Sequence, residues 1–418
     1  MTVIDRIVDT RPLRSHPAFR RIWIGTTAAS FSGQVAVVAV LYQVWELTHS
    51  SAWVGAIGIA TAVPTIIFGL LGGALADATD RRRLVAITSA GAVTAAILLA
   101  VQAGLGLGSL PLVLVLVAAQ TSCGALGASA RRTFVPRLLP RDQVPAGIAL
   151  NHVSFQAAML VGPAVAGLVL AHWGLTWAYV LDAAAITISL YGVARLPRMR
   201  PTGGPTPVSL ASTWDGWRFI LRRPALSGSL ATDLAATVLA MPIALFPVLN
   251  EQRFEGSPQT LGLFLSAIAV GGIAASLTSG ILTRARRPGM VSLVAATTWG
   301  LALAGFGLVD TLFPTLAWLA VAGAADTVSV ISRGTLIQLA TPDPYLGRVS
   351  SVENVVGVGG PGIGNARAGA VASLTSASTA AVTGGLACAV VVVTLAATNP
   401  ALRRWRHQDA ERINQPSE

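Results

Sequence analysis

Residues 52–83 decide the kind of fold, and they read AWVGAIGIATAVPTIIFGLLGGALADATDRRR. Residues 52–76 contain no charged side chain, whereas the seven residues that follow contain two aspartates and three arginines. A helix of about 20 mainly apolar residues crosses the hydrocarbon core of a bilayer. The stretch therefore predicts a membrane-spanning helix that ends in a short basic loop.

The same pattern recurs along the chain and predicts twelve spanning helices. Composition agrees, because 53% of the 418 residues are hydrophobic and only 11% are charged. A soluble domain carries about 25% charged residues, so this chain has too few to cover a surface that faces water. We expect an all-α integral membrane protein with spans at 22–46, 52–76, 84–105, 109–130, 146–171, 174–195, 224–249, 259–283, 289–309, 312–332, 349–372 and 376–398.

The basic residues, all 29 of them arginines, test the number of spans. If the N-terminus is cytoplasmic, 27 of them fall on the cytoplasmic side, in the two tails and in alternate loops. The exceptions are Arg253 on the outer side and Arg367 within a span. Cytoplasmic loops are enriched in basic residues, so both termini are expected in the cytoplasm. Arginines that cluster between apolar runs also argue against nucleic acid as the partner.

The two halves of the chain repeat their pattern at a spacing of 201–207 residues. GALAD (73–77) and the arginines after it separate spans two and three, and GILTR (280–284) separates spans eight and nine. Duplications of six helices are known from transporters with two pseudo-symmetric halves. The predicted segments are an N-terminal tail (1–21), a six-helix half (22–195), a cytoplasmic linker (196–223), a second six-helix half (224–398) and a C-terminal tail (399–418).

Residues 73–83 resemble a signature of the major facilitator superfamily, G-x-L-a-D-r-x-G-r-r/k. Two positions depart from it, since Ala78 replaces a common basic residue and Asp80 a common glycine. The resemblance implies a cytoplasmic latch between the two halves, in which a carboxylate pairs with the positive N-terminal end of a helix. The latch would contain Gly73, Asp77, Asp80, Arg81, Arg82 and Arg83. A plain basic loop is the alternative.

A second motif, GPAVAG, lies in span five at residues 162–167. Gly162, Pro163 and Gly167 resemble the G-P-x-x-G-G motif of antiporters, with Ala166 in place of one glycine. Small residues let helices approach closely, and proline allows a kink. The resemblance implies export rather than uptake.

Longer stretches resemble the enterobactin (siderophore) exporter branch of the superfamily. They include HPAFR (16–20), THS (48–50), ARRPG (285–289) and LGRV (346–349). The branch also contains broader drug and macrolide exporters, so the cargo does not follow. The resemblance implies a drug:proton antiporter type of protein in the bacterial cytoplasmic membrane, with a monomeric working unit.

Several ionisable residues fall inside predicted spans, where each costs about 2.5–3.5 kcal/mol of insertion free energy. Asp233 in span seven is the first candidate for proton coupling, because low-dielectric surroundings favour the neutral carboxyl and allow proton exchange near neutral pH. The alternative is a structural carboxylate. Asp326 in span ten is the second candidate, or else an ion-pair partner of Arg333, seven residues later on the same helical face.

Three further charged residues have structural interpretations. Glu353 lies near the expected start of span eleven, where it would meet the latch at Asp77 or cap the helix. Asp182 and Arg367 both fall toward the outer leaflet and are predicted to form an ion pair. Alternatively, Arg367 attracts an anionic cargo.

Uncharged polar residues at membrane depth are candidates for binding cargo in a cavity. They are Gln34, Gln120, Asn151 and Gln156. Resemblance to the family places Gln34 and Gln120 on helices that line the cavity. Hydrogen bonds between helices explain these residues equally well.

The absent motifs narrow the function. Without lysine the chain lacks the phosphate-binding lysine of a Walker loop, so the expected energy source is the proton-motive force. The two cysteines and five histidines are scattered, and neither HExxH nor GxSxG occurs, so we expect neither a metal, a cofactor nor an enzyme. The expected function is efflux of a small molecule, such as a siderophore, another secondary metabolite or a drug, by alternating access. The alternatives are uptake by symport and a lipid-handling or non-transporting membrane protein.

Overall fold

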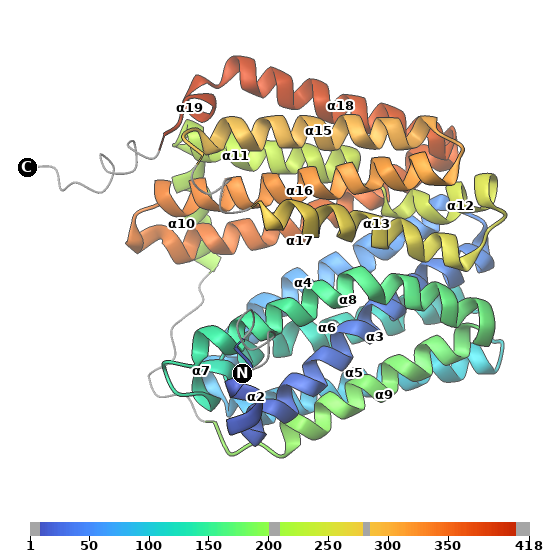
Figure 1. Ribbon diagram of the computed structural model, residues 1–418, viewed down its shortest axis with the longest axis vertical. Helices are drawn as coiled ribbons and strands as arrows, with labels where there is room; N and C mark the ends of the chain where they lie inside the picture. The colour runs from blue at the N-terminus through green and yellow to red at the C-terminus, as the bar shows by residue number, and fades with distance from the viewer. Residues whose placement is uncertain (1–8, 200–209, 279–284, 407–418) are drawn as a thin grey trace, which may run out of the picture. The chain divides into compact units, whose positions relative to one another are not determined.

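The computed structural model describes residues 9–199, 210–278 and 285–406, and all regular elements among them are helices (Figure 1). In this part of the chain, eleven helical stretches are long and apolar enough to cross a membrane. The twelfth expected span is α17, which is 32 residues long but contains several glycines together with Asn365 and Arg367. The twelve-helix membrane fold predicted from the sequence is confirmed.

The helices follow the predicted order and differ from it mainly at their ends. Those before the linker are α2 (Arg11–Ser15), α3 (Pro17–Thr48), α4 (Ser51–Ala78), α5 (Arg81–Gly104), α6 (Leu110–Arg132), α7 (Phe134–Leu138), α8 (Val144–Trp173) and α9 (Leu175–Ala194). The linker contains α10 (Leu210–Leu221). Those that follow are α11 (Pro224–Leu234), η1 (Ala235–Leu239), η2 (Ile243–Leu245), α12 (Phe246–Phe254), α13 (Pro258–Leu277), α15 (Pro288–Leu308), α16 (Leu312–Ala340), α17 (Asp343–Leu374), α18 (Ala377–Thr398) and α19 (Pro400–Arg403).

Local sequence explains where several helices begin and end. Proline stands in the first turn of α11 and α15, where its missing N–H leaves no intrahelical bond unmade. Ser376 caps α18, since its hydroxyl accepts a hydrogen bond from the Thr379 N–H at 3.0 Å. Gly174 separates α8 from α9 at φ +79°, a left-handed backbone conformation that glycine adopts without strain.

The helices pack into two compact units. Unit 1 contains Met1–Thr48, Val63–Val208 and Ser257–Ser266, and unit 2 contains the remaining segments, His49–Ala62, Ser209–Gly256 and Ala267–Glu418. In unit 1, α3 packs on α8 and α9, and α5 packs on α6 and α9. In unit 2, α15 packs on α16 and α18, and α17 contacts α10, η1 and α18.

Small residues lie between helices, whereas large apolar side chains point outward. A Cβ added to Gly300 of α15 would lie 2.6 Å from the Gly385 carbonyl oxygen of α18, so only glycine allows this approach. Ile87, Val115 and Val390 are 61%, 64% and 65% exposed, respectively. Such an apolar exterior suits contact with lipid.

Two features differ from the predicted spans. Span seven is broken, because α11 passes into the π-helical turn η1, and the 3-10 turn η2 precedes α12. Helix α16 continues to Ala340, eight residues beyond its predicted end at 332, and α17 begins six residues before 349. Arg333, which fell just beyond predicted span ten, therefore lies inside a helix, where the buried carboxylate of Asp233 pairs with its charge.

Candidate functional site

Arg333 is the centre of a charged cluster in unit 2. Its Nη1 forms a short ion pair with Oδ1 of Asp233 on α11, and its Nε lies 3.9 Å from Oε1 of Glu353 on α17. The side chains of Arg333 and Asp233 are 10% and 7% exposed, and that of Glu353 is 31% exposed. Three helices thus bring one buried cation and two carboxylates together.

Asp326 adds a third carboxylate to this cluster. It precedes Arg333 by seven residues on α16 and lies close enough to feel the charges of Arg333 and Asp233. Unlike Asp233, it is exposed. One arginine is therefore paired with two carboxylates and lies within electrostatic range of a third, so the cluster carries excess negative charge unless a carboxyl is protonated.

The backbone at Asp233 is irregular. The π-helical turn η1 begins two residues later, and the Thr237 hydroxyl donates a hydrogen bond to the Asp233 carbonyl at 2.8 Å. π-helical turns are frequent at functional sites. Oδ2 of Asp233 is buried and accepts no hydrogen bond from the described residues. This oxygen is a place where a proton can bind.

The sequence predicted these residues separately. We expected Asp233 and Asp326 as candidates for proton coupling and Arg333 as a partner of Asp326; the structure gives Arg333 the ion pairs with Asp233 and Glu353. The prediction that Glu353 caps the start of α17 is wrong, because that helix begins ten residues earlier, at Asp343.

Asp182 lies in a polar cluster of unit 1, buried at 1% exposure. Its two carboxylate oxygens accept hydrogen bonds from the Ser32 hydroxyl at 2.8 Å and from Nε2 of Gln120 at 2.6 Å. Within unit 1, Asp182 thus has neutral partners in place of the Arg367 predicted from the sequence. Sequence reasoning also missed Ser32, because a serine within a span carries no distinctive signal.

Arg367 instead binds the broken backbone of span seven. Its guanidinium donates hydrogen bonds to the carbonyls of Val238, at 2.9 Å, and of Leu239. Two residues earlier on α17, Oδ1 of Asn365 accepts a hydrogen bond from the Ala244 N–H at 3.1 Å. The break frees these backbone groups, and buried backbone groups require partners. This explains Arg367 without an acidic partner.

A buried network of neutral groups in unit 1 was also missed. The amides of Gln43 on α3 and Gln102 on α5 exchange hydrogen bonds at 3.1 Å, and the Tyr179 hydroxyl donates to Gln43 at 2.7 Å. The network joins three helices. Gln43 and Gln102, two glutamines within apolar runs, could have revealed this network. We had considered Gln34, Gln120 and Gln156 instead.

The antiporter-like motif forms close helix contacts. A Cβ added to Gly162 would lie 2.6 Å from Cβ of Gln34, and one added to Gly167 would lie 2.6 Å from the Pro258 carbonyl oxygen. Gln34 is thus half-buried against the motif rather than wholly open. Pro163 is buried inside α8. The motif lets α3 and the start of α13 approach α8 within unit 1.

The other cavity candidates, Asn151 and Gln156, lie half-buried on α8. Neither side chain has a hydrogen-bond partner among the described residues. In contrast to Gln120, both amides are available to a ligand.

The predicted latch residues form bonds within unit 1. Oδ1 of Asp80 accepts hydrogen bonds from the N–H groups of Arg82 at 3.0 Å, Arg83 at 3.3 Å and Met199 at 3.3 Å, so Asp80 caps α5. The Arg82 guanidinium donates to the Ala194 carbonyl at 2.5 Å. Burial raises the pKa of Asp80, but these N–H groups and the Arg82 charge outweigh it and lower the pKa overall.

The rest of the latch is described only in part. Gly73 is half-buried in α4, and Nε of Arg81 donates a hydrogen bond to the Ala76 carbonyl at 3.1 Å. The side chain of Asp77 and the repeat of the motif at 280–284 lie outside the described residues. Among the described side chains, no group of three His, Cys, Asp or Glu residues is placed to hold a metal ion.

Comparison with known families supplies the context for these clusters. A model of the family described as transmembrane secretion effector, within the major facilitator superfamily, matches residues 9–418. The chain belongs to this family. It is an efflux transporter and a multi-pass membrane protein, and it meets the lipid bilayer and a small-molecule cargo.

Relatives of this efflux transporter are similar over nearly their whole length. The enterobactin exporter EntS of Shigella boydii serotype 18 is 28% identical over 394 residues, which are 94% of each chain. EntS of Escherichia coli O139:H28 has the same identity and coverage.

Solved structures share the fold at low sequence identity. A point mutant of the nucleoside transporter NupG has a TM-score of 0.74 at 15% identity, covering 92% of this chain and 99% of that one. A POT family transporter in complex with a thioalcohol-conjugated peptide has a TM-score of 0.72 at 11% identity, covering 95% and 99%. Both are transporters of the same fold.

Proposed function

We propose that this transporter exports its cargo in exchange for protons, and that the cluster around Arg333 couples the two movements. The observation that carries the proposal is one buried arginine of unit 2 that pairs with Asp233 and Glu353 and lies within electrostatic range of Asp326. Ionisable groups inside a membrane commonly mark ion and substrate pathways. Asp233 forms a buried ion pair with Arg333, and its Oδ2 has no hydrogen-bond partner among the described residues. A proton can therefore bind at this oxygen.

The coupling step is a competition between a proton and Arg333 for Asp233. When Asp233 is ionised, it holds Arg333 in the ion pair. A proton on its unpaired Oδ2 weakens that pair and leaves Arg333 to Glu353 and Asp326. Because the three carboxylates lie on α11, α16 and α17, moving Arg333 among them changes how these helices attract one another.

The orientation follows from the arginines. Both termini lie in the cytoplasm of a bacterial cell, and the protein works as a monomer in the cytoplasmic membrane. The two halves rock between states open to either side, with Asp77 and the basic loop after it as the cytoplasmic latch. Cargo enters from the cytoplasm and leaves outside as a proton enters.

The cargo is a siderophore or a related secondary metabolite or drug. EntS, which is named as an exporter of enterobactin, supports this class through similarity over 94% of both chains. Asn151, Gln156 and Gln34 supply amide groups that could bind polar cargo atoms, while Gln120 is occupied by Asp182.

Transport in inverted vesicles tests the coupling. Wild-type protein should accumulate cargo when a proton gradient is imposed, and Asp233→Asn should lose gradient-driven transport. The matched control is Asp142→Asn, which removes an exposed carboxyl outside the membrane-spanning helices and should transport normally. Both variants should elute as folded monomers. Normal gradient-driven transport by Asp233→Asn would refute the role of Asp233.

The cargo class is tested in iron-starved cells. Loss of the protein should retain siderophore inside the cell, and its return should restore secretion. If secretion is unchanged, siderophore is not the main cargo, and the vesicle assay should then be repeated with drug-like and polyketide compounds.

A further inference from the structure

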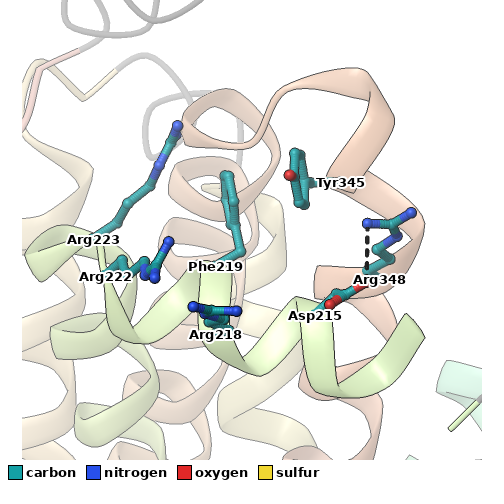
Figure 2. Close-up of a pocket in the computed structure, with 7 residues that line it drawn as sticks. All are labelled: Asp215, Arg218, Phe219, Arg222, Arg223, Tyr345 and Arg348. Atoms are coloured by element: carbon teal, nitrogen blue, oxygen red, sulfur yellow. Dashed lines mark hydrogen bonds and ion pairs between the residues drawn. The ribbon is translucent and has the colours of Figure 1, made fainter. Parts of the chain in front are cut away.

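A basic pocket lies in unit 2 between α10 and the start of α17 (Figure 2). Its volume is about 410 Å³. Four arginines and one aspartate contribute to its lining, so the pocket carries a large excess of positive charge. The lining residues are Asp215, Arg218, Phe219, Arg222, Arg223, Tyr345 and Arg348.

Two stacked aromatic rings form part of the lining of this pocket. Phe219 of α10 stacks on Tyr345 of α17 with 4.4 Å between ring centroids and 17° between planes. The Arg223 guanidinium lies 4.1 Å from the Phe219 centroid and donates a hydrogen bond to the Ala340 carbonyl at 3.0 Å. Figure 2 shows the two rings side by side, with Arg223 beyond Phe219 and Arg348 beyond Tyr345.

Of the pocket's other charged residues, one arginine has an acidic partner and two do not. Asp215 is paired with Arg348, whose Nη1 lies 3.4 Å from its Oδ2. Arg218 of α10 and Arg222, which directly follows the helix, have no acidic partner among the described residues. They are one helical turn apart, since the Arg222 N–H donates a hydrogen bond to the Arg218 carbonyl at 3.3 Å. Like charges at this spacing repel each other in a helix. An anion between them would remove that repulsion.

The planar donors of arginine suit the oxygens of phosphate. On α10, Trp214 and Leu221 are 71% and 67% exposed beside these arginines. A helix with exposed apolar and basic residues of this kind lies in the interface of a membrane, and basic pockets beside spanning helices bind anionic lipid head groups.

We propose that this pocket binds the phosphate head group of an anionic membrane lipid. Arg218 and Arg222 contact the phosphate oxygens, and the stacked rings hold α10 against α17 beside them. The site is separate from the charged cluster at Arg333 and does not depend on which cargo is moved. Its placement on the inner surface rests on the proposed orientation, whereas lipid binding itself does not.

Lipid binding by the purified full-length protein tests the proposal. Phosphatidylglycerol added in detergent should raise the thermal unfolding temperature and remain bound in native mass spectrometry, while phosphatidylcholine should do neither. The double variant Arg218→Gln/Arg222→Gln should bind phosphatidylglycerol about thirtyfold more weakly, from the loss of two basic contacts. The control Arg403→Gln/Arg404→Gln removes two arginines near the C-terminus and should bind as the wild type does.

Further arms separate the possible sources of the phosphate. If inorganic phosphate alone protects the wild type and phosphatidylglycerol does not, the pocket takes a soluble anion and the lipid assignment is wrong. Equal binding of phosphatidylglycerol by the double variant and the wild type would also overturn it. Should the double variant misfold, Arg218→Lys/Arg222→Lys keeps the charge but loses the planar donors, and weaker phosphatidylglycerol binding is again expected. Binding of phosphatidylglycerol by this variant as tight as by the wild type would refute arginine recognition.

Discussion

Arg333 is one buried cation that serves several carboxylates, and this asymmetry gives unequal effects of mutation. Arg333→Gln leaves Asp233, Asp326 and Glu353 without a cation, whereas Asp233→Asn leaves Arg333 with two carboxylates. Removing one partner of a buried pair costs about 3–5 kcal/mol of unfolding free energy when the other charge stays uncompensated. We therefore expect Arg333→Gln to lower the thermal unfolding temperature at neutral pH more than Asp233→Asn does. Equal decreases in the unfolding temperature of the two variants would argue against one arginine serving several carboxylates.

Asp80 gives a prediction about pH, because its pKa is lowered in the folded protein. The charge of a carboxyl with a lowered folded pKa stabilises the protein above its unfolded value of about 3.9, and that contribution is lost as the pH falls through the folded pKa. Asp80→Ala removes the cap of α5 and should cost about 1 kcal/mol at pH 7. Asp80→Asn keeps a capping oxygen and should cost less.

The measurement for Asp80 is thermal unfolding of wild type and both variants between pH 3 and pH 8. The difference between wild type and Asp80→Asn should stay constant from pH 6 to pH 8 and shrink in acid below pH 4. A difference that grows in acid would mean that the carboxylate is not stabilised by its N–H donors and Arg82.

At the scale of elements, the broken span seven depends on α17 for its polar partners. Arg367→Met removes the donors to the Val238 and Leu239 carbonyls. A buried carbonyl left without a partner costs about 1–3 kcal/mol. We expect a lower unfolding temperature and faster hydrogen exchange confined to residues 235–245. Exchange in this segment as slow as in wild type would contradict the bracing role of Arg367.

A glycine of α18 packs against the hydrogen bond between Arg367 and the Leu239 carbonyl, so its substitution tests the same interaction. A Cβ added to Gly384 of α18 would meet the Leu239 carbonyl oxygen and would also lie 2.6 Å from Nη2 of Arg367, so Gly384→Ala should disturb both partners of this hydrogen bond and destabilise the protein. Gly124→Ala on α6 is the matched control, since apart from its own helical backbone no atom of the described residues lies within 4 Å of its added Cβ. The control should be neutral or stabilising, because alanine is the better helix former by about 1 kcal/mol. The unfolding temperatures of both variants measure the difference. Equal temperatures would show that α18 does not pack tightly against Arg367 and Leu239.

The sequence predicted the helices better than their irregularities. Long apolar runs and flanking arginines located the spans, since both signals are local. The break after Asp233 was not predictable from local sequence, because its freed backbone groups are satisfied by Asn365 and Arg367, more than 120 residues away. The same reason explains why the carbonyl partners of Arg367 were not predicted.

For the whole molecule, the arginine asymmetry predicted twelve spans because a single missing helix would invert every later loop. It could not predict which helices are neighbours. The cluster at Arg333 combines α11, α16 and α17, and each residue was a candidate before its partners were known. Helix neighbours depend on packing across long sequence separations, and polar residues identify a candidate site without specifying its pairs.

The orientation of the molecule gives the last prediction, which uses single cysteines in a chain carrying Cys123→Ala and Cys388→Ala. Leu107→Cys follows three spans and Leu374→Cys precedes one, and both positions are exposed. If both termini are cytoplasmic, a membrane-impermeant maleimide should label these two cysteines in intact cells. Asp142→Cys, one span beyond Leu107, should react only after the membrane is opened. Labelling of Leu107→Cys and Asp142→Cys from the same side would mean that α6 does not cross the membrane. Exact reversal would place the basic loops outside, against the charge asymmetry from which the orientation was inferred.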